Sequence, residues 1–121
     1  MGKVVHFEIP ATDPAAAMRF YEKVFGWTYQ LFPGQEYWFA IGGDEEARGS
    51  NGAIMKRADP SQPVTVTVEV PDLDATLATV AREGGVVVVP KSPVPGMGWF
   101  AFFKDPDGNI VGAWAHDPGA A

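Results

Sequence analysis

The chain has 121 residues, contains no cysteine and carries a formal net charge of −6. This length fits one compact domain, and the acidic balance argues against a nucleic-acid groove or an anionic membrane surface as partner. Without cysteine, disulfides and thiolate chemistry are excluded. No apolar run is long enough to span a bilayer, and the first ten residues alternate like a strand rather than a signal peptide, so we expect a cytoplasmic protein.

The first half of the chain predicts the element order β-α-β-β-β. Residues 4–9 alternate, with Val5, Phe7 and Ile9 on one face and with Val4, His6 and Glu8 on the other. An aspartate followed by proline at position 14 predicts a helix over residues 14–25, which a glycine ends. Further strands are predicted at residues 27–32, 37–41 and 53–56.

The second half repeats this order after a linker at residues 58–63. Residues 64–70 alternate with valines on one face and Thr65, Thr67 and Glu69 on the other. A helix is predicted over residues 73–84, and strands follow at residues 86–89, 99–103 and 110–114. The two halves superpose at a shift of 59 residues, which an internal repeat explains better than coincidence. The sequence therefore predicts an α+β protein with modules at residues 1–57 and 64–121 that together form one compact domain.

Two segments carry a more specific pattern. The first runs from His6 to Asp13 (HFEIPATD) and continues with FYEKVFGW at residues 20–27. The second, WFAFFKDPDGN at residues 99–109, places an Asp-Pro-Asp-Gly-Asn turn before the last strand. Together, within a duplicated βαβββ frame, these segments resemble the vicinal oxygen chelate superfamily, which includes glyoxalases, bleomycin resistance proteins and dioxygenases.

This resemblance implies a fold in which two βαβββ modules form curled mixed sheets around a cup, with helices outside. The cup of such proteins binds a small molecule, often beside a divalent metal. Relatives of this size are mostly homodimers, so we expect a homodimer. Whether the cup closes within one chain or across a dimer stays open.

The resemblance also implies metal-ligand positions inside the cup, and most of them lack a ligand here. The first holds His6, its equivalent in the second module holds Thr65, and the final strand holds Gly112 where metal-dependent relatives carry Glu. The matching strand of the first module, residues 50–57, has no carboxylate or imidazole. Only His6 remains, and His116 could offer a second nitrogen, so we expect no bound divalent metal. His6 is then a residual ligand, an acid/base group or a simple hydrogen-bonding residue.

Other residues could line the cup and contact a ligand. Strand parity turns Glu8, Thr67 and Glu69 inward, and Glu8 joins His6 as a candidate acid or base, although parity also allows exposure at the rim. Trp114 faces inward beside the small Gly112, and Trp99 adds flat apolar surface. Tyr37 and Trp38 also add flat apolar surface, and these aromatic residues could equally be core. On the first helix, we expect Phe20, Tyr21 and Phe25 to pack in the core. The segment at residues 90–98 is either a plain connection or a lid over the cup.

Two functions from different classes follow from these positions. The first is a metal-free protein that binds a small molecule in an aromatic-lined cup. The predicted ligand-binding residues are His6, Thr65, Thr67, Glu69, Trp99, Gly112 and Trp114. The alternative is a divalent-metal-dependent lyase, isomerase or dioxygenase, and a metal-free enzyme with His6 or Glu8 as base is a third possibility. The fold alone does not choose among them.

Overall fold

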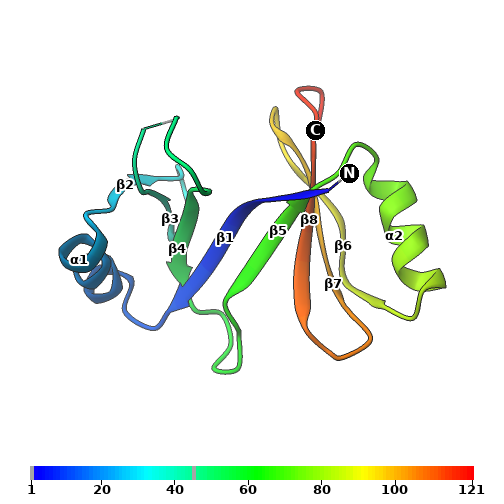
Figure 1. Ribbon diagram of the computed structural model, residues 1–121, viewed down its shortest axis with the longest axis horizontal. Coiled ribbons are helices and arrows are strands. Elements are labelled where there is room, and N and C mark those ends of the chain that lie inside the picture. Colours follow the sequence, from blue (N-terminus) through cyan, green and yellow to red (C-terminus); the bar gives the residue numbers. More distant parts are fainter. Residues whose placement is uncertain (1, 45) are drawn as a thin grey trace. The chain divides into compact units, whose positions relative to one another are not determined.

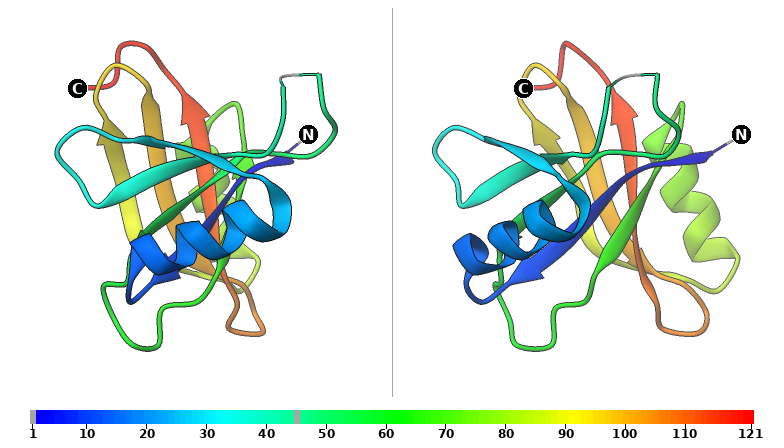
Figure 2. Two further views of the ribbon diagram at one scale, coloured as in Figure 1. Left: turned by 90° about the vertical axis from the view of Figure 1, so that its left-hand side faces the viewer. Right: turned by 60° about the vertical axis from the view of Figure 1, so that its left-hand side comes forward.

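The computed structural model describes residues 2–44 and 46–121 and shows an α+β protein built from two compact units. One unit comprises Val5–Thr65, and the other comprises residues 66–121 together with residues 2–4. Each contains one βαβββ module, with a helix over its own sheet (Figures 1 and 2). The tandem βαβββ prediction is thereby confirmed.

The first module has a four-stranded sheet in the order β2-β3-β4-β1. Strand β1 runs parallel to β4, and the other neighbours are antiparallel. The elements are β1 (Lys3–Ala11), α1 (Pro14–Phe25), β2 (Thr28–Leu31), β3 (Tyr37–Ile41) and β4 (Gly52–Lys56). The predicted bounds of α1 and β3 match these ranges.

Helix α1 begins and ends as its sequence predicts. The Asp13 carboxylate accepts a hydrogen bond from the Ala16 amide at 3.1 Å, and Gly26 ends the helix with a φ of 73°. Near the end of the helix, Tyr21 stacks on Trp27, with ring centroids 5.0 Å apart, and Trp27 contacts Phe7 of β1 at 5.4 Å. Phe7 therefore faces the helix, and β1 turns its alternate residues to the opposite face.

Part of the aromatic surface of α1 is not core. We expected Phe20, Tyr21 and Phe25 to pack inside, but Phe20 and Phe25 are each 59% exposed. Only Tyr21, which lies against Trp27, follows the expectation. Helical periodicity identifies a row of apolar side chains along α1 but does not show how much of that row the sheet covers.

The second module repeats the arrangement with the sheet order β5-β8-β7-β6. Its elements are β5 (Thr65–Glu69), α2 (Leu73–Arg82), β6 (Val86–Val94), β7 (Gly98–Lys104) and β8 (Ile110–His116). Helix α2 packs on a small core of Leu73, Ala101, Ala113 and Ala115. Between β7 and β8, the carboxylate of Asp105 accepts hydrogen bonds from the amides of Asp107 and Asn109, both at 2.9 Å.

Strand β6 is longer than predicted, and this corrects the lid hypothesis. Residues 90–94 pair with β7 as part of the strand, and only residues 95–97 form a turn. Prolines at positions 90 and 93 had suggested a loop. They are accommodated because β7 is the one neighbour of β6 in its module, so β6 needs few amide donors on its outer side, and the pairing is bulged.

The two modules share one register at the predicted 59-residue shift. Pro14 and Leu73 begin the two helices. In the parallel pairs, Glu8 lies opposite Ala53, and the equivalent Thr67 lies opposite Gly112. The face of each sheet away from its helix, called the open face below, can therefore be compared position by position.

Candidate functional site

Three polar side chains meet on the open face of the first module. Nε2 of His6 lies 2.7 Å from the Tyr37 hydroxyl, which donates a hydrogen bond of 2.6 Å to Oε2 of Glu8. His6 and Glu8 project from alternate positions of β1, and Tyr37 reaches them from the start of β3. We call this group the His6–Tyr37–Glu8 trio. It confirms the predicted shared face of His6 and Glu8.

The single phenolic proton fixes the direction of this chain. Because Tyr37 donates to Glu8, its oxygen can only accept from His6, so Nε2 of His6 carries a proton. Burial, followed by the negative charge of Glu8, raises the pKa of the Tyr37 phenol above its ordinary value of 10.0. The phenol thus stays protonated across the physiological range, and the proton order runs from His6 through Tyr37 to Glu8.

Aromatic rings border the trio. Tyr37 makes edge contacts with Phe32 and Phe39, with ring centroids 6.2 and 5.5 Å away. All three rings are half-buried. The side chains of His6 and Glu8 remain 24% and 19% exposed, so a molecule arriving from solvent can reach both. The arrangement combines accessible polar atoms with an apolar rim, as small-molecule sites do.

The open face of the second module is apolar where the first is polar. Phe100 lies opposite Trp114, and Phe102 lies opposite Gly112 in the β7–β8 pairing. A Cβ on Gly112 would come within 2.6 Å of Oγ1 of Thr67 and 3.0 Å of the Phe102 ring. The space beside this glycine is therefore filled by its neighbours, and no larger residue fits without displacing them.

The other predicted residues of the second module have different surroundings. Thr65 and Thr67 are buried, at 8% exposure each, whereas Glu69 is exposed opposite Trp114. Trp99 lies on the helix-covered side of the sheet, next to the α2 core, and its indole donates to the carboxylate of Asp117 at 3.0 Å. Trp99 and Trp114 therefore do not form one wall.

His116 closes β8 at an exposed position. Together with Lys3, Glu69, Val70 and Pro71, it lines a surface pocket of about 340 Å³. His116 thus lies beside Glu69 within its own unit, and its suggested role as a second metal-binding nitrogen has no support from this placement.

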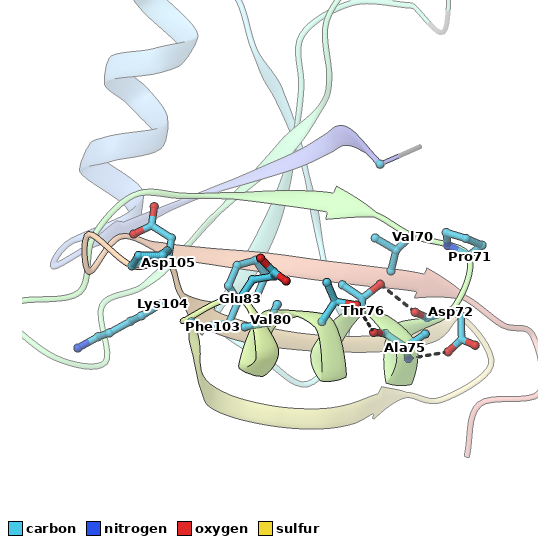
Figure 3. A pocket seen from close by; sticks show the side chains of 14 residues that line it. Val70, Pro71, Asp72, Ala75, Thr76, Val80, Glu83, Phe103, Lys104 and Asp105 are labelled. Atoms are coloured by element: carbon cyan, nitrogen blue, oxygen red, sulfur yellow. Dashed lines mark hydrogen bonds between the residues drawn. The ribbon is translucent and has the colours of Figure 1, made fainter.

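A larger groove, of about 530 Å³, lies along α2 (Figure 3). It is lined mainly by the Val70–Asp72 connection, one face of the helix and the end of β7. None of the residues predicted to bind a ligand lines it. Helix α2 contacts β6, β7 and β8, so the β5 end of the module's sheet is less covered and the groove lies there.

The residues at the family metal positions do not fit a divalent ion. Nε2 of His6 carries the proton that it donates to Tyr37, so Nδ1 is the one nitrogen of this ring that keeps a lone pair for a metal. At Gly112, Thr67 and Phe102 occupy the place of a ligand side chain. Within residues 2–44 and 46–121, no three His, Asp or Glu side chains gather into a possible metal centre.

Tyr37 is the functional candidate that sequence reasoning missed. The sequence predicts the bounds of its strand correctly, but it indicates only flat apolar surface for Tyr37. Tyr37 lies 29 residues from Glu8 in the chain, and only the β1–β4–β3 register brings the two together. The available signal was parity, since Tyr37 and Phe39 share one face of β3, but parity does not say which face points away from the helix.

Comparisons with known proteins give a consistent result. Residues 3–112 match the profile of the Glyoxalase/Bleomycin resistance protein/Dioxygenase superfamily. CFP32 of Mycobacterium bovis, a provisionally named glyoxylase, is 34% identical over 114 residues; the match covers 90% of this chain but only 42% of that protein. A glyoxylase-like domain-containing protein of Didymella fabae is 31% identical, with 89% of each chain covered.

Solved structures show the same fold at low identity. Methylmalonyl-CoA epimerase from Mycobacterium tuberculosis superposes with a TM-score of 0.67 and 16% identity, covering 95% of this chain and 88% of that one. This likeness concerns the arrangement of strands and helices, because such low identity says nothing about the reaction.

Proposed function

Since the chain belongs to the Glyoxalase/Bleomycin resistance protein/Dioxygenase superfamily, we propose that it binds a small organic molecule on the open face of its first module, without a catalytic divalent metal. The observation that carries this proposal is the His6–Tyr37–Glu8 trio, whose accessible polar atoms lie beside half-buried aromatic rings.

Electrostatics and packing support a metal-free site. The proton on Nε2 of His6 is held by Tyr37, and the small Gly112 is enclosed by Thr67 and Phe102. A metal at Nε2 of His6 would have to disrupt the hydrogen bonds of the trio, and Glu8 is the one carboxylate of the trio that could offset its charge. Elemental analysis of protein purified without nickel or chelator is expected to find no stoichiometric divalent metal. Metal bound through His6 would favour the lyase, isomerase or dioxygenase alternative instead.

A second candidate function is metal-free acid/base catalysis. The observation that favours it is the continuous donor chain from His6 through Tyr37 to Glu8, along which a proton can move. In that function Nδ1 of His6 would take a proton from the substrate while Nε2 passes its proton to Tyr37 and Tyr37 passes its own to Glu8. A ligand consumed with turnover, rather than recovered unchanged after incubation, would distinguish catalysis from binding.

A thermal-shift screen of small molecules tests the binding function directly. A compound that binds only the folded protein stabilises it by an amount that grows with the logarithm of the compound's concentration above Kd, and the melting temperature of the protein rises in the same way. The shift should shrink in Tyr37→Phe and persist in Tyr29→Phe, because the Tyr29 hydroxyl instead bonds to the Met18 carbonyl of α1 at 3.1 Å. Equal loss of the shift in both variants, or none in either, would place binding elsewhere.

A homodimer remains part of this proposal. Phe20, Val24 and Phe25 of α1 and the nearby Leu31 are each more than half exposed, and apolar surface of this kind favours association. Light scattering at micromolar concentration should therefore give twice the mass of one chain; a monomer would argue against it. Neither described helix has the length and apolar character needed to traverse a bilayer.

A further inference from the structure

From the hydrogen-bond direction and the charges of the trio, we infer that the ligand of the first module is an organic cation, a protonated amine or amidine carried on an apolar body. The inference rests on the proposed function, since it names the chemical class that the same face recognises. It goes beyond family membership, which does not fix the charge of a ligand.

The first argument concerns the polar atoms that the trio leaves open. Tyr37 uses its one proton on Oε2 of Glu8 and receives the Nε2 proton of His6. Among the described residues, no hydrogen bond reaches Oε1 of Glu8 or Nδ1 of His6, and no side-chain polar atom is both buried and unpaired. These two atoms therefore face accessible space. Oε1 of Glu8 accepts hydrogen bonds, and so does Nδ1 of His6 when the ring is neutral. A ligand must therefore supply hydrogen-bond donors to these two atoms.

The second argument concerns charge. Glu8 contributes a carboxylate to this face, and the two basic side chains at the end of the neighbouring strand β4 are already bonded. The guanidinium of Arg57 donates to the carbonyls of Gln62 and Pro10 at 2.7 and 3.0 Å, and the ammonium of Lys56 donates to the Thr12 carbonyl at 2.7 Å. Nε2 of His6 lies 3.7 Å from the Glu8 carboxylate and is bonded to Tyr37. An anionic ligand would bring a second negative charge beside Glu8, whereas a cation would neutralise the carboxylate in a partly desolvated place.

The third argument concerns the aromatic rim. Phe32, Tyr37 and Phe39 contact one another with interplanar angles of 57–78°, so ring faces and edges point in several directions beside the carboxylate. A cation over a ring face gains about 0.5–2 kcal/mol, the larger values where water is excluded. Carboxylate and rings together select a ligand that is both positively charged and apolar.

Three probes with one skeleton test the inference: 3-phenylpropylamine, 3-phenylpropanol and 3-phenylpropanoate. At pH 7 they are a cation, a neutral molecule and an anion. Amide chemical shifts in the NMR spectrum give both the site and the Kd. We expect the amine to perturb β1 and β3 and to bind at least about tenfold more tightly than the anion, which corresponds to about 1.4 kcal/mol.

Glu8→Gln should reduce this preference to about twofold or less, because the amide has no charge to offer. Glu83→Gln is the control, since it removes one negative charge at an exposed site after α2 and should leave the preference unchanged. The ratio of Kd values for the amine and the anion in the wild-type protein tests the inference alone. The inference can therefore be contradicted even if Glu8→Gln does not fold.

The outcomes separate the two proposals. If the alcohol or the anion binds β1 and β3 as tightly as the amine, the organic-cation inference is wrong and the proposed binding function stands. If none of the three probes perturbs these strands at millimolar concentration, both are wrong. Amine binding that perturbs only other regions would also overturn the inference.

Discussion

The open faces of the two modules carry different residues at equivalent positions of one register. His6 and Glu8 of β1 correspond to Thr65 and Thr67 of β5, as the shared pairing of Glu8 with Ala53 and of Thr67 with Gly112 shows. Tyr37 of β3 corresponds to Phe100 of β7, because each lies opposite the residue two positions further along the last strand.

This difference shows that the repeat preserves backbone pairing, not chemistry. Both modules keep the helix caps and the strand register, yet the second module carries threonines at the positions equivalent to His6 and Glu8. The hydroxyl that joins His6 to Glu8 is absent from Phe100, and the second module instead packs Thr67 against Gly112 and Phe102. At equivalent positions the first module thus presents a hydrogen-bonded polar trio, and the second module presents packed side chains.

The strongest test of this difference places a carboxylate in the second module. Gly112→Glu should lower the free energy of unfolding by about 3–5 kcal/mol, because the side chain would clash with Thr67 and Phe102 and bury an unpaired charge. Urea denaturation measures the loss. Gly112→Ala, which adds volume without charge, should cost about 1–3 kcal/mol. A Gly112→Glu protein of wild-type stability that gains stoichiometric zinc would show that the second module retains a metal site.

A smaller effect is expected when the first module is made to resemble the second. Tyr37→Phe leaves Oε2 of Glu8 and Nε2 of His6 without their partner, at a cost of about 1–3 kcal/mol. The partial exposure of both side chains favours the lower end, because water can replace the hydroxyl. Chemical denaturation tests this, and unchanged stability would mean that the trio does not support the fold.

The same phenol predicts how stability changes at alkaline pH. The folded pKa of Tyr37 is raised, first by burial and then by Glu8, so the unfolded chain loses this proton first. The contribution of Tyr37 is therefore complete below the unfolded pKa of 10.0 and declines as pH rises above it. Melting temperatures from pH 8 to 11 should fall less steeply in Tyr37→Phe than in the wild type. Parallel curves would contradict the raised pKa.

The smallest effects are expected where the modules are alike. Asp13 and Asp72 cap α1 and α2 through the amides of Ala16 and Ala75, at 3.1 and 3.0 Å. Asp13→Ala and Asp72→Ala should each cost about 1 kcal/mol. Denaturation of the two variants side by side measures how similar the capped ends are. If the loss of stability in one variant is more than twice that in the other, caps of similar geometry contribute unequally to the stability of the two modules.

Local patterns in the sequence predicted the scaffold well. Aspartate caps, terminating glycines and strand alternation located both helices and the faces of β1 and β5, because each signal acts within a few residues. The first difference lies at β6, where Pro90 and Pro93 indicated a loop. Their tolerance depends on β6 having one neighbour in its module, a property of the whole sheet.

The candidate site was harder to predict than the scaffold. His6 and Glu8 share a strand, so alternation alone placed them together. Tyr37 joins them through pairing between three strands, and the enclosure of Gly112 depends on the ring of Phe102 from a neighbouring strand. Long-range register of this kind has no signature in one sequence. Trp99 is a related case, because it shares the helix-covered face of β7 with Ala101 and alternation alone does not show which face the helix covers.

The turn at Asp105 bears on how the chain folds. The Asp105 carboxylate accepts hydrogen bonds from the amides of Asn109 and Asp107, and these bonds lower the pKa of Asp105. Strands β7 and β8 are therefore joined by a short, preorganised connection. The corresponding strands β3 and β4 are separated by the ten residues 42–51. Because a shorter closure loses less chain entropy, the β7–β8 hairpin should form early. We therefore expect the strands of the second module to pair before the strands of the first module do.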